Sequence, residues 1–220
     1  MKLRNTNIIV IASLLALSGC GDGVWGNARL VMQNAIKNSG EQPIPHTREE
    51  INGLPYASIA AQLENNPPSL MVLGYADNDK LQWISSNSNS ISTRNGRIVH
   101  TVGFDIDLTH VEMIGHEFLG TARQATNFPY TYKMMVDTKS PYPDSETLNC
   151  SVDIEGEAMI EILGFSYDTY LLEEKCESPD GWNVHNSYWA DKLTGFVWRS
   201  RQGVVDGQYT IEINVLKPLG

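Results

Sequence analysis

Two histidines and two glutamates lie close together near the middle of the chain and have side chains that can hold a metal ion: His110, Glu112, His116 and Glu117. Zinc-dependent hydrolases often present such ligands as H-E-x-x-H on one helix. The order of residues here is different, and the sequence identifies no third ligand. We therefore expect a solvated turn between strands at this point, and neither a metal nor another cofactor.

A second group offers carboxylates at alternating positions: Asp153, Glu155, Glu157 and Glu161. Two facing carboxylates form the catalytic pair of most glycoside hydrolases. A period of two is, however, typical of the wet face of a half-buried strand. The chain also lacks the G-x-S-x-G elbow of serine hydrolases and the phosphate-binding loop of nucleotide-binding proteins. We expect a protein that is not an enzyme, and keep a glycan-acting enzyme as an alternative.

Aromatic and arginine side chains within expected strands offer a third kind of chemistry, the recognition of sugars. Flat rings stack on sugar faces, and guanidinium groups pair with the carboxylates of acidic sugars. The candidate contacts for a glycan or a partner are Trp189, Arg199, Trp83 and Arg97. We expect Trp189 and Arg199 to be exposed cross-strand neighbours, because they flank the turn at 191–195. The alternative is that the aromatic residues form the core and the arginines cap it.

Three cysteines occur in the chain, and two of them, Cys150 and Cys176, lie in its second half. Their spacing fits neither a C-x-x-C redox motif nor a zinc site. In an oxidising compartment such a pair forms a disulfide, and we expect one here that ties a strand to the loop after another strand. Two buried free thiols are the alternative.

The third cysteine, Cys20, ends the stretch Leu17-Ser18-Gly19-Cys20 after a basic start and an apolar run at 8–17. That run is shorter than the roughly 20 residues of a membrane-spanning helix. The layout is that of a secretory signal, and its last four residues resemble a bacterial lipobox. The resemblance implies cleavage of a leader at 1–19 and acylation of Cys20; the alternatives are an ordinary signal peptide and a core helix with a chance cysteine. Because Gly21 follows the cysteine, where inner-membrane lipoproteins carry Asp, it also implies an anchor on the periplasmic face of the outer membrane.

The charge of the mature chain excludes several partners. Cleavage removes two of the 16 basic residues, which leaves 14 against 26 acidic ones and a formal net charge of −12. Nucleic acids and anionic membrane surfaces require basic patches, so we expect neither as a partner. We expect the lipid anchor to hold the protein on the membrane.

The pattern of apolar residues predicts an all-β protein with one N-terminal helix. Helical spacing over 27–38 predicts an amphipathic helix, and Thr47 to Glu50 has the spacing of a capping box. From Leu54 onward short runs of β-forming residues alternate with turn residues, and Asn95-Gly96 is typical of a tight hairpin. We expect an anchor, helix and connector at 20–53, followed by a single domain at 54–220. Its meandering antiparallel strands are expected to form a curved sheet or an open barrel.

Four blocks of the chain resemble the GfcB/YjbF lipoproteins. They are Ile51-Asn52-Gly53-Leu54-Pro55-Tyr56-Ala57-Ser58-Ile59; Leu70 to Gly74 with Gln82-Trp83-Ile84-Ser85; Thr93 to Val99 with Thr101-Val102-Gly103; and Tyr188 to Asp191 with Thr194 to Gln202. The resemblance implies an all-β lipoprotein that takes part in making or exporting group 4 capsule or a related exopolysaccharide. It supplies no catalytic residues.

The leading hypothesis is a non-enzymatic outer-membrane lipoprotein that assists polysaccharide secretion by binding the glycan or another export protein. The alternative is a periplasmic carrier of lipids or lipoproteins, whose curved sheet encloses an acyl chain. A cavity lined by aliphatic side chains would favour the carrier, and an open groove with aromatic and arginine residues would favour glycan binding.

Overall fold

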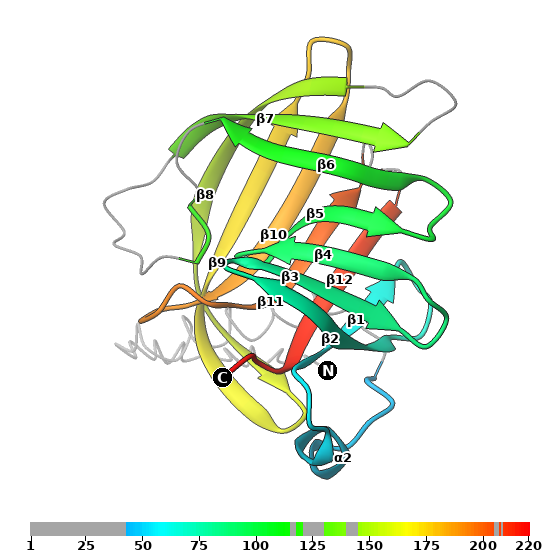
Figure 1. The fold of residues 1–220 in the computed structure, drawn as a ribbon. Coiled ribbons are helices and arrows are strands. Elements are labelled where there is room, and N and C mark those ends of the chain that lie inside the picture. Colours follow the sequence, from blue (N-terminus) through cyan, green and yellow to red (C-terminus); the bar gives the residue numbers. More distant parts are fainter. Residues whose placement is uncertain (1–42, 115–117, 121–129, 140–144, 205–206, 208) are drawn as a thin grey trace, which may run out of the picture. The chain divides into compact units, whose positions relative to one another are not determined.

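The computed structural model describes residues 43–114, 118–120, 130–139, 145–204, 207 and 209–220. The expected helix at 27–38 and Cys20 lie outside these residues. One helix, α2 (Arg48–Gly53), precedes the strands (Figure 1). In chain order these are β1 (Ser58–Leu63), β2 (Ser69–Asp77), β3 (Lys80–Ser85), β4 (Ser90–Arg94), β5 (Arg97–Val102), β6 (Asp107–Ile114), β7 (Tyr130–Lys139), β8 (Ser145–Ile162), β9 (Phe165–Glu177), β10 (Asn183–Asp191), β11 (Val197–Val204) and β12 (Tyr209–Lys217).

The strands form one twelve-stranded antiparallel sheet in the order β5-β4-β3-β2-β1-β12-β11-β10-β9-β8-β7-β6. Neighbours in the sheet are neighbours in the chain, except that β12 pairs with β1. The sheet curls until its edge strands β5 and β6 lie beside each other (Figure 1). Side chains join these edges, as the Leu108 amide donates to Thr101 Oγ1 at 2.8 Å. The predicted single all-β domain with a curved antiparallel sheet is confirmed.

Both faces of the central strands are buried. On β1, Ile59 and Ala61 belong to the main core on one face, whereas Ala60 belongs to a smaller core on the other face. Helix α2 contributes Ile51 to the smaller core. A strand covered on both faces has no wet side, so period-two alternation is lost in these strands.

Local signals in the sequence act as expected at two places. Thr47 accepts a hydrogen bond from the Glu50 amide and donates its own amide to Glu50 Oε2 at 2.8 Å, which completes the capping box of α2. Asn95 and Gly96 have φ angles of 51° and 93°, the left-handed values that the tight hairpin between β4 and β5 requires.

Two expectations about the strands are wrong. His110 and Glu112 lie in strand β6, not in a turn, and both are exposed, whereas His116 and Glu117 lie outside the described residues. A register shift between Leu108 and His110 interrupts the alternation that would have revealed this strand. Cys176 lies within β9, not in the loop after it. The alternating carboxylates Asp153, Glu155, Glu157 and Glu161 are exposed on β8, as the wet-face interpretation expects.

Candidate functional site

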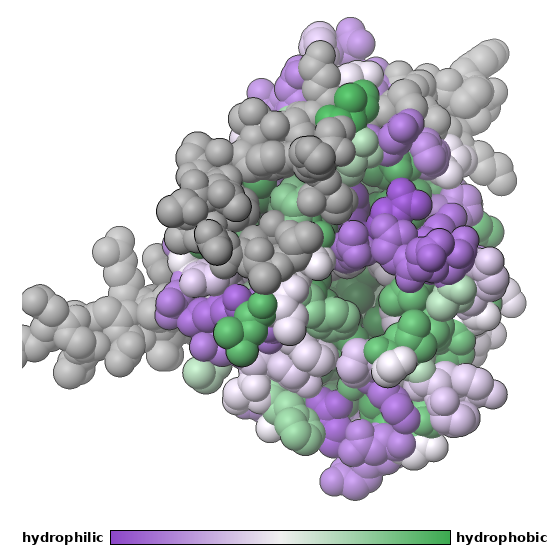
Figure 2. All heavy atoms as spheres, turned by 60° about the vertical axis from the view of Figure 1, so that its left-hand side comes forward, coloured by the Kyte–Doolittle hydropathy of each residue, from purple (hydrophilic) through white to green (hydrophobic). Residues whose placement is uncertain are grey.

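A cavity of about 370 Å³ opens at one end of the curled sheet. Its mouth lies among the β2–β3, β4–β5 and β10–β11 turns and the C-terminal tail. The residues that line it are Ile59, Asn78, Asp79, Leu81, Trp83, Thr93, Asn95, Gly96, Gly120, Thr194, Phe196, Val197, Ser200, Ile213, Val215, Pro218 and Leu219. Figure 2 shows a hollow with hydrophobic walls and hydrophilic residues around it. We call this cavity the mouth pocket; its volume is within the range of small-molecule sites.

The inner wall of the mouth pocket is apolar because β1, β3 and β12 turn aliphatic residues toward it, including Ile59, Leu81 and Ile213. Trp83, one of the predicted contact residues, is 3% exposed and belongs to this wall. Its indole N–H donates to Thr93 Oγ1 at 2.9 Å. The polar edge of Trp83 is therefore already paired with the protein.

The rim of the mouth pocket is polar but locally balanced in charge. Asn78, Asp79, Asn95 and Thr194 contribute amide, carboxylate and hydroxyl groups. Arg94 Nε lies 3.3 Å from Asp79 Oδ2, in a pair with both side chains about half exposed. The rim thus holds hydrogen-bonding groups without an excess of positive charge.

The β10–β11 turn on this rim is built around Asp191. Its Oδ1 accepts hydrogen bonds from the Leu193 amide, the Thr194 amide and the Thr194 hydroxyl, at 3.0, 2.8 and 2.9 Å. Burial by itself would raise the pKa of Asp191, but these hydrogen bonds to the charged form outweigh it, so the pKa lies below its ordinary value of 3.8. The ionised carboxylate fixes the turn that presents Thr194 and Phe196 to the pocket.

Three large apolar side chains around the mouth face solvent. Leu193 is 85% exposed, Phe196 is 37% exposed and Leu219 is 53% exposed. Phe196 and Leu219 line the pocket, and Leu193 precedes Thr194 in the same turn. The sequence interpretation missed these residues. The available signal was a leucine and a phenylalanine placed in an otherwise polar turn.

A second cavity of about 200 Å³ lies further along the same interior face. Its walls combine apolar residues, among them Ala61, Met71 and Ile211, with five polar residues, Asn66, Ser69, Ser85, Asn87 and Asn89. Ala61 and Ile211 are two positions along β1 and β12 from Ile59 and Ile213, which line the mouth pocket, and all four belong to the main core. The inner face of the sheet therefore carries two hollows in line.

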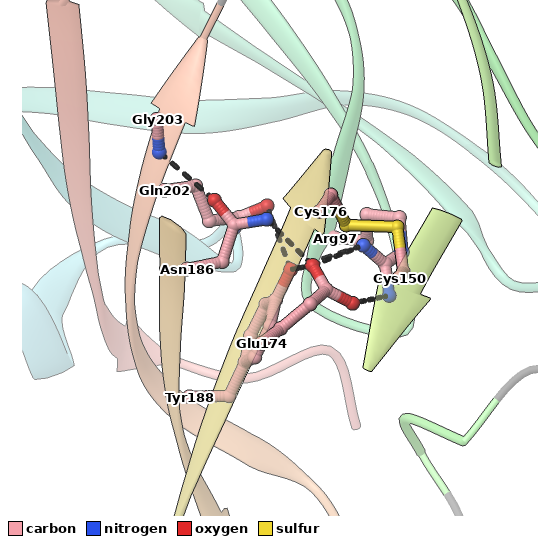
Figure 3. The surroundings of a disulfide bond; sticks show 8 residues. All are labelled: Arg97, Cys150, Glu174, Cys176, Asn186, Tyr188, Gln202 and Gly203. Atoms are coloured by element: carbon pink, nitrogen blue, oxygen red, sulfur yellow. Dashed lines mark hydrogen bonds and ion pairs between the residues drawn. A yellow bond between two sulfur atoms is a disulfide. The ribbon is translucent and has the colours of Figure 1, made fainter. Parts of the chain in front are cut away.

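Arg97 takes part in a buried polar cluster. Its guanidinium donates two hydrogen bonds to Glu174, at 2.9 and 2.8 Å, and both side chains are almost fully buried (Figure 3). The hydroxyl of Tyr188 and the amide of Asn186 also donate to Glu174 Oε2, at 3.2 and 2.5 Å. Gln202 joins the cluster through Tyr188. With its donors directed at Glu174 and its side chain enclosed, Arg97 has a structural role.

Trp189 and Arg199 are cross-strand neighbours, as expected, but they are buried and not exposed. They are 6% and 3% exposed, and Trp189 belongs to the smaller core. Arg199 Nε donates to Asn214 Oδ1 at 2.6 Å. Strands β10 and β11 lie in the middle of a sheet that is covered on both faces, which leaves these residues no surface. Among the four predicted contact residues, Trp83 alone lines the mouth pocket.

The structure joins Cys150 and Cys176 in a disulfide next to the Arg97 cluster (Figure 3). The two residues are register partners on the neighbouring strands β8 and β9, with Cα atoms 4.0 Å apart. The disulfide therefore joins two strands that are already paired in the sheet, which is the position of a structural bond.

Two further features bear on the chemistry. Among the residues that the structure describes, no group of three or more histidine, cysteine or acidic side chains is placed to hold a metal ion. Within the same ranges, no helix is both long enough and apolar enough to cross a membrane. The arrangement of the mouth pocket is that of a binding site with an apolar interior and a polar rim.

Comparison with known proteins gives concordant matches. The family model described as "Group 4 capsule polysaccharide lipoprotein gfcB, YjbF" matches residues 25–216. The uncharacterized lipoprotein GfcB of Escherichia coli K12 is 27% identical over 213 residues, which cover 96% of this chain and 98% of GfcB. The uncharacterized lipoprotein YjbF of the same strain is 22% identical over 178 residues, 81% of this chain and 83% of YjbF. The crystal structure of the hypothetical E. coli K12 lipoprotein YmcC shares the fold, with a TM-score of 0.70 and 21% identity, over 92% of this chain and 100% of YmcC.

Proposed function

Because the chain belongs to the family of group 4 capsule polysaccharide lipoproteins related to GfcB and YjbF, we propose that it acts in capsule or exopolysaccharide production as a binding protein and not as an enzyme. The mouth pocket is the observation that carries the proposal. Its size suits a small ligand or one end of a larger one.

The residues that line the mouth pocket support binding over catalysis. Among those that the structure describes, Asp79 is the one acidic residue, and there is neither a histidine nor a cysteine. Hydrolysis of a glycosidic bond ordinarily needs two carboxyl groups on either side of the bond. A nucleophile such as Ser200 would need a general base within reach, and its hydroxyl instead accepts a hydrogen bond from Gln202 at 2.9 Å.

The location belongs to the same proposal. Acylated Cys20 holds the protein on the periplasmic face of the outer membrane, where the mouth pocket meets the polysaccharide, its lipid-linked form or another protein of the export machinery. Several acyl chains on one residue give an anchor that does not dissociate on the time scale of export.

A deletion strain tests this function directly. Loss of the gene should reduce surface polysaccharide, and a plasmid copy of the wild-type chain should restore it. The Cys20→Ser chain should fail to restore it at equal protein level, because it lacks the anchor. Normal polysaccharide in the deletion strain would overturn the proposal.

The Asp79→Asn variant separates binding from catalysis. It removes the one carboxylate among the described lining residues while keeping the size and hydrogen-bonding capacity of the side chain. We expect it to restore polysaccharide to at least half of the wild-type amount. A complete loss at normal protein level would show that the carboxylate itself is required, which the proposed binding role does not predict.

A further inference from the structure

We propose that the mouth pocket binds the aliphatic chain of an amphiphile, and that the neutral, hydroxyl-rich head of this ligand stays at the rim. The inference rests on the proposed binding function and names its ligand class, which is a lipid-linked sugar or a glycolipid. A free glycan without a lipid chain is the competing ligand.

The interior of the pocket favours a hydrocarbon over a sugar. Its walls include Ile59, Leu81, Val197 and Ile213, together with the ring of Trp83. The two hydroxyl oxygens on this wall already accept hydrogen bonds from the protein, that of Thr93 from Trp83 and that of Ser200 from Gln202. Sugar hydroxyls pushed into such a wall would lose water without finding partners, whereas methylene groups gain by leaving water.

The rim selects the head of the ligand. Asn78, Asn95 and Thr194 offer amide and hydroxyl groups, which suit the hydroxyl groups of a sugar. Arg94 and Asp79 neutralise each other, and the whole chain carries a net charge of −10. A strongly anionic head therefore finds no excess of positive charge at this rim, and a neutral head is favoured.

The exposed apolar residues provide an entry site for the aliphatic tail of the ligand. Phe196 and Leu219 line the pocket and are 37% and 53% exposed, and the exposed Leu193 lies in the same turn as Phe196. An aliphatic chain that leaves a membrane or a carrier can contact these side chains before it enters the pocket. The second cavity, in line with the first along β1 and β12, offers room for the far end of a long chain.

A titration with three probes tests the ligand class. The probes are dodecyl maltoside, octyl maltoside and maltose, each below its micelle-forming concentration, and the protein is the mature chain with Cys20→Ser, which avoids extraction in detergent. The three probes share one disaccharide and differ only in the apolar tail, which maltose lacks. Dodecyl maltoside should bind at least about tenfold more tightly than octyl maltoside, and maltose should not bind measurably. Equal affinity for all three would overturn the inference in favour of a glycan site.

Two variants place the binding in the mouth pocket. Leu219→Asp puts a charge on the rim, and its matched control is Ile114→Asp, since Ile114 is equally exposed at 52% but lies on β6. We expect Leu219→Asp to weaken dodecyl maltoside binding at least about fivefold and Ile114→Asp to leave it unchanged. Val215→Phe fills the pocket from its wall and should abolish binding. Equal binding by Leu219→Asp and Ile114→Asp would overturn the assignment, even if Val215→Phe does not fold.

The outcomes also separate this inference from the proposed function. Tail-independent binding together with a polysaccharide defect in the deletion strain would refute the aliphatic ligand and leave the function intact. Tail-dependent binding with normal polysaccharide in the deletion strain would support a lipid site and refute the function.

Discussion

Trp189 and Arg199 face each other across the β10–β11 ladder, with the guanidinium carbon of Arg199 5.8 Å from the centroid of the Trp189 ring. This is the distance of a cation–π contact. Because both side chains are buried, the contact stabilises the sheet and offers nothing to a ligand. The two residues therefore have a structural role, and their substitution should lower the free energy of unfolding.

Arg199→Ala should destabilise the protein. It removes the contact with Trp189 and the hydrogen bonds to Asn214 and to the Glu161 carbonyl, so we expect a loss of about 2–4 kcal/mol in the free energy of unfolding. Arg201→Ala is the matched control, because Arg201 lies two residues along the same strand and is exposed. Urea denaturation followed by circular dichroism measures both. Equal effects of the two substitutions would contradict the structural role of Arg199.

Arg97→Met should leave the Glu174 carboxylate buried without its charged partner. Breaking a buried ion pair on one side costs about 3–5 kcal/mol, so this variant should be strongly destabilised. Arg94→Met is the control, because the Arg94–Asp79 pair is exposed and such pairs contribute about 0–1 kcal/mol. The double variant Arg97→Met, Glu174→Leu should regain part of the loss. If Arg97→Met and the double variant were equally stable, the unpaired Glu174 charge would not be the cause of the destabilisation.

The double variant Cys150→Ser, Cys176→Ser tests the disulfide. For a bridge between residues 26 apart, the chain-entropy model gives a stabilisation of about 3–4 kcal/mol. Urea denaturation of oxidised wild-type protein against this variant measures the difference. Two alkylatable thiols in denatured wild-type protein that was purified under oxidising conditions would show that the bridge does not form.

Asp191 should make part of the stability dependent on pH. Its pKa is lowered in the folded protein, so its ionised form contributes stability that is fully present above the ordinary, unfolded pKa of 3.8. This contribution is lost as the pH falls through the lower, folded pKa. The difference in unfolding free energy between the wild type and Asp191→Asn should therefore be constant between about pH 5 and pH 8. It should shrink below about pH 4, near the ordinary pKa of a carboxyl group. A difference that stays constant down to about pH 3 would contradict this prediction.

Features that depend on a few neighbouring residues could be predicted from the amino-acid sequence. The capping box at Thr47, the Asn95-Gly96 hairpin and the run of short β-forming segments each depend on a few neighbouring residues, and the structure contains all of them. The four blocks that resemble the GfcB/YjbF lipoproteins likewise carried the family assignment, since a family pattern is a property of the sequence. The lipidation of Cys20 and the helix at 27–38 remain predictions from the same local signals.

The covered face of each strand and the set of residues that meet at the mouth pocket depend on the packing of distant segments and could not be predicted in this way. Trp189 and Arg199 had the residue types and spacing of a surface site, but the pairing of β12 with β1 places their strands in the middle of a sheet with two buried faces. Asn78, Asn95, Thr194 and Leu219 come from four separate turns or ends, and only the curl of the sheet brings them together. Burial and pocket formation depend on contacts between distant segments, and no local pattern in the sequence encodes them.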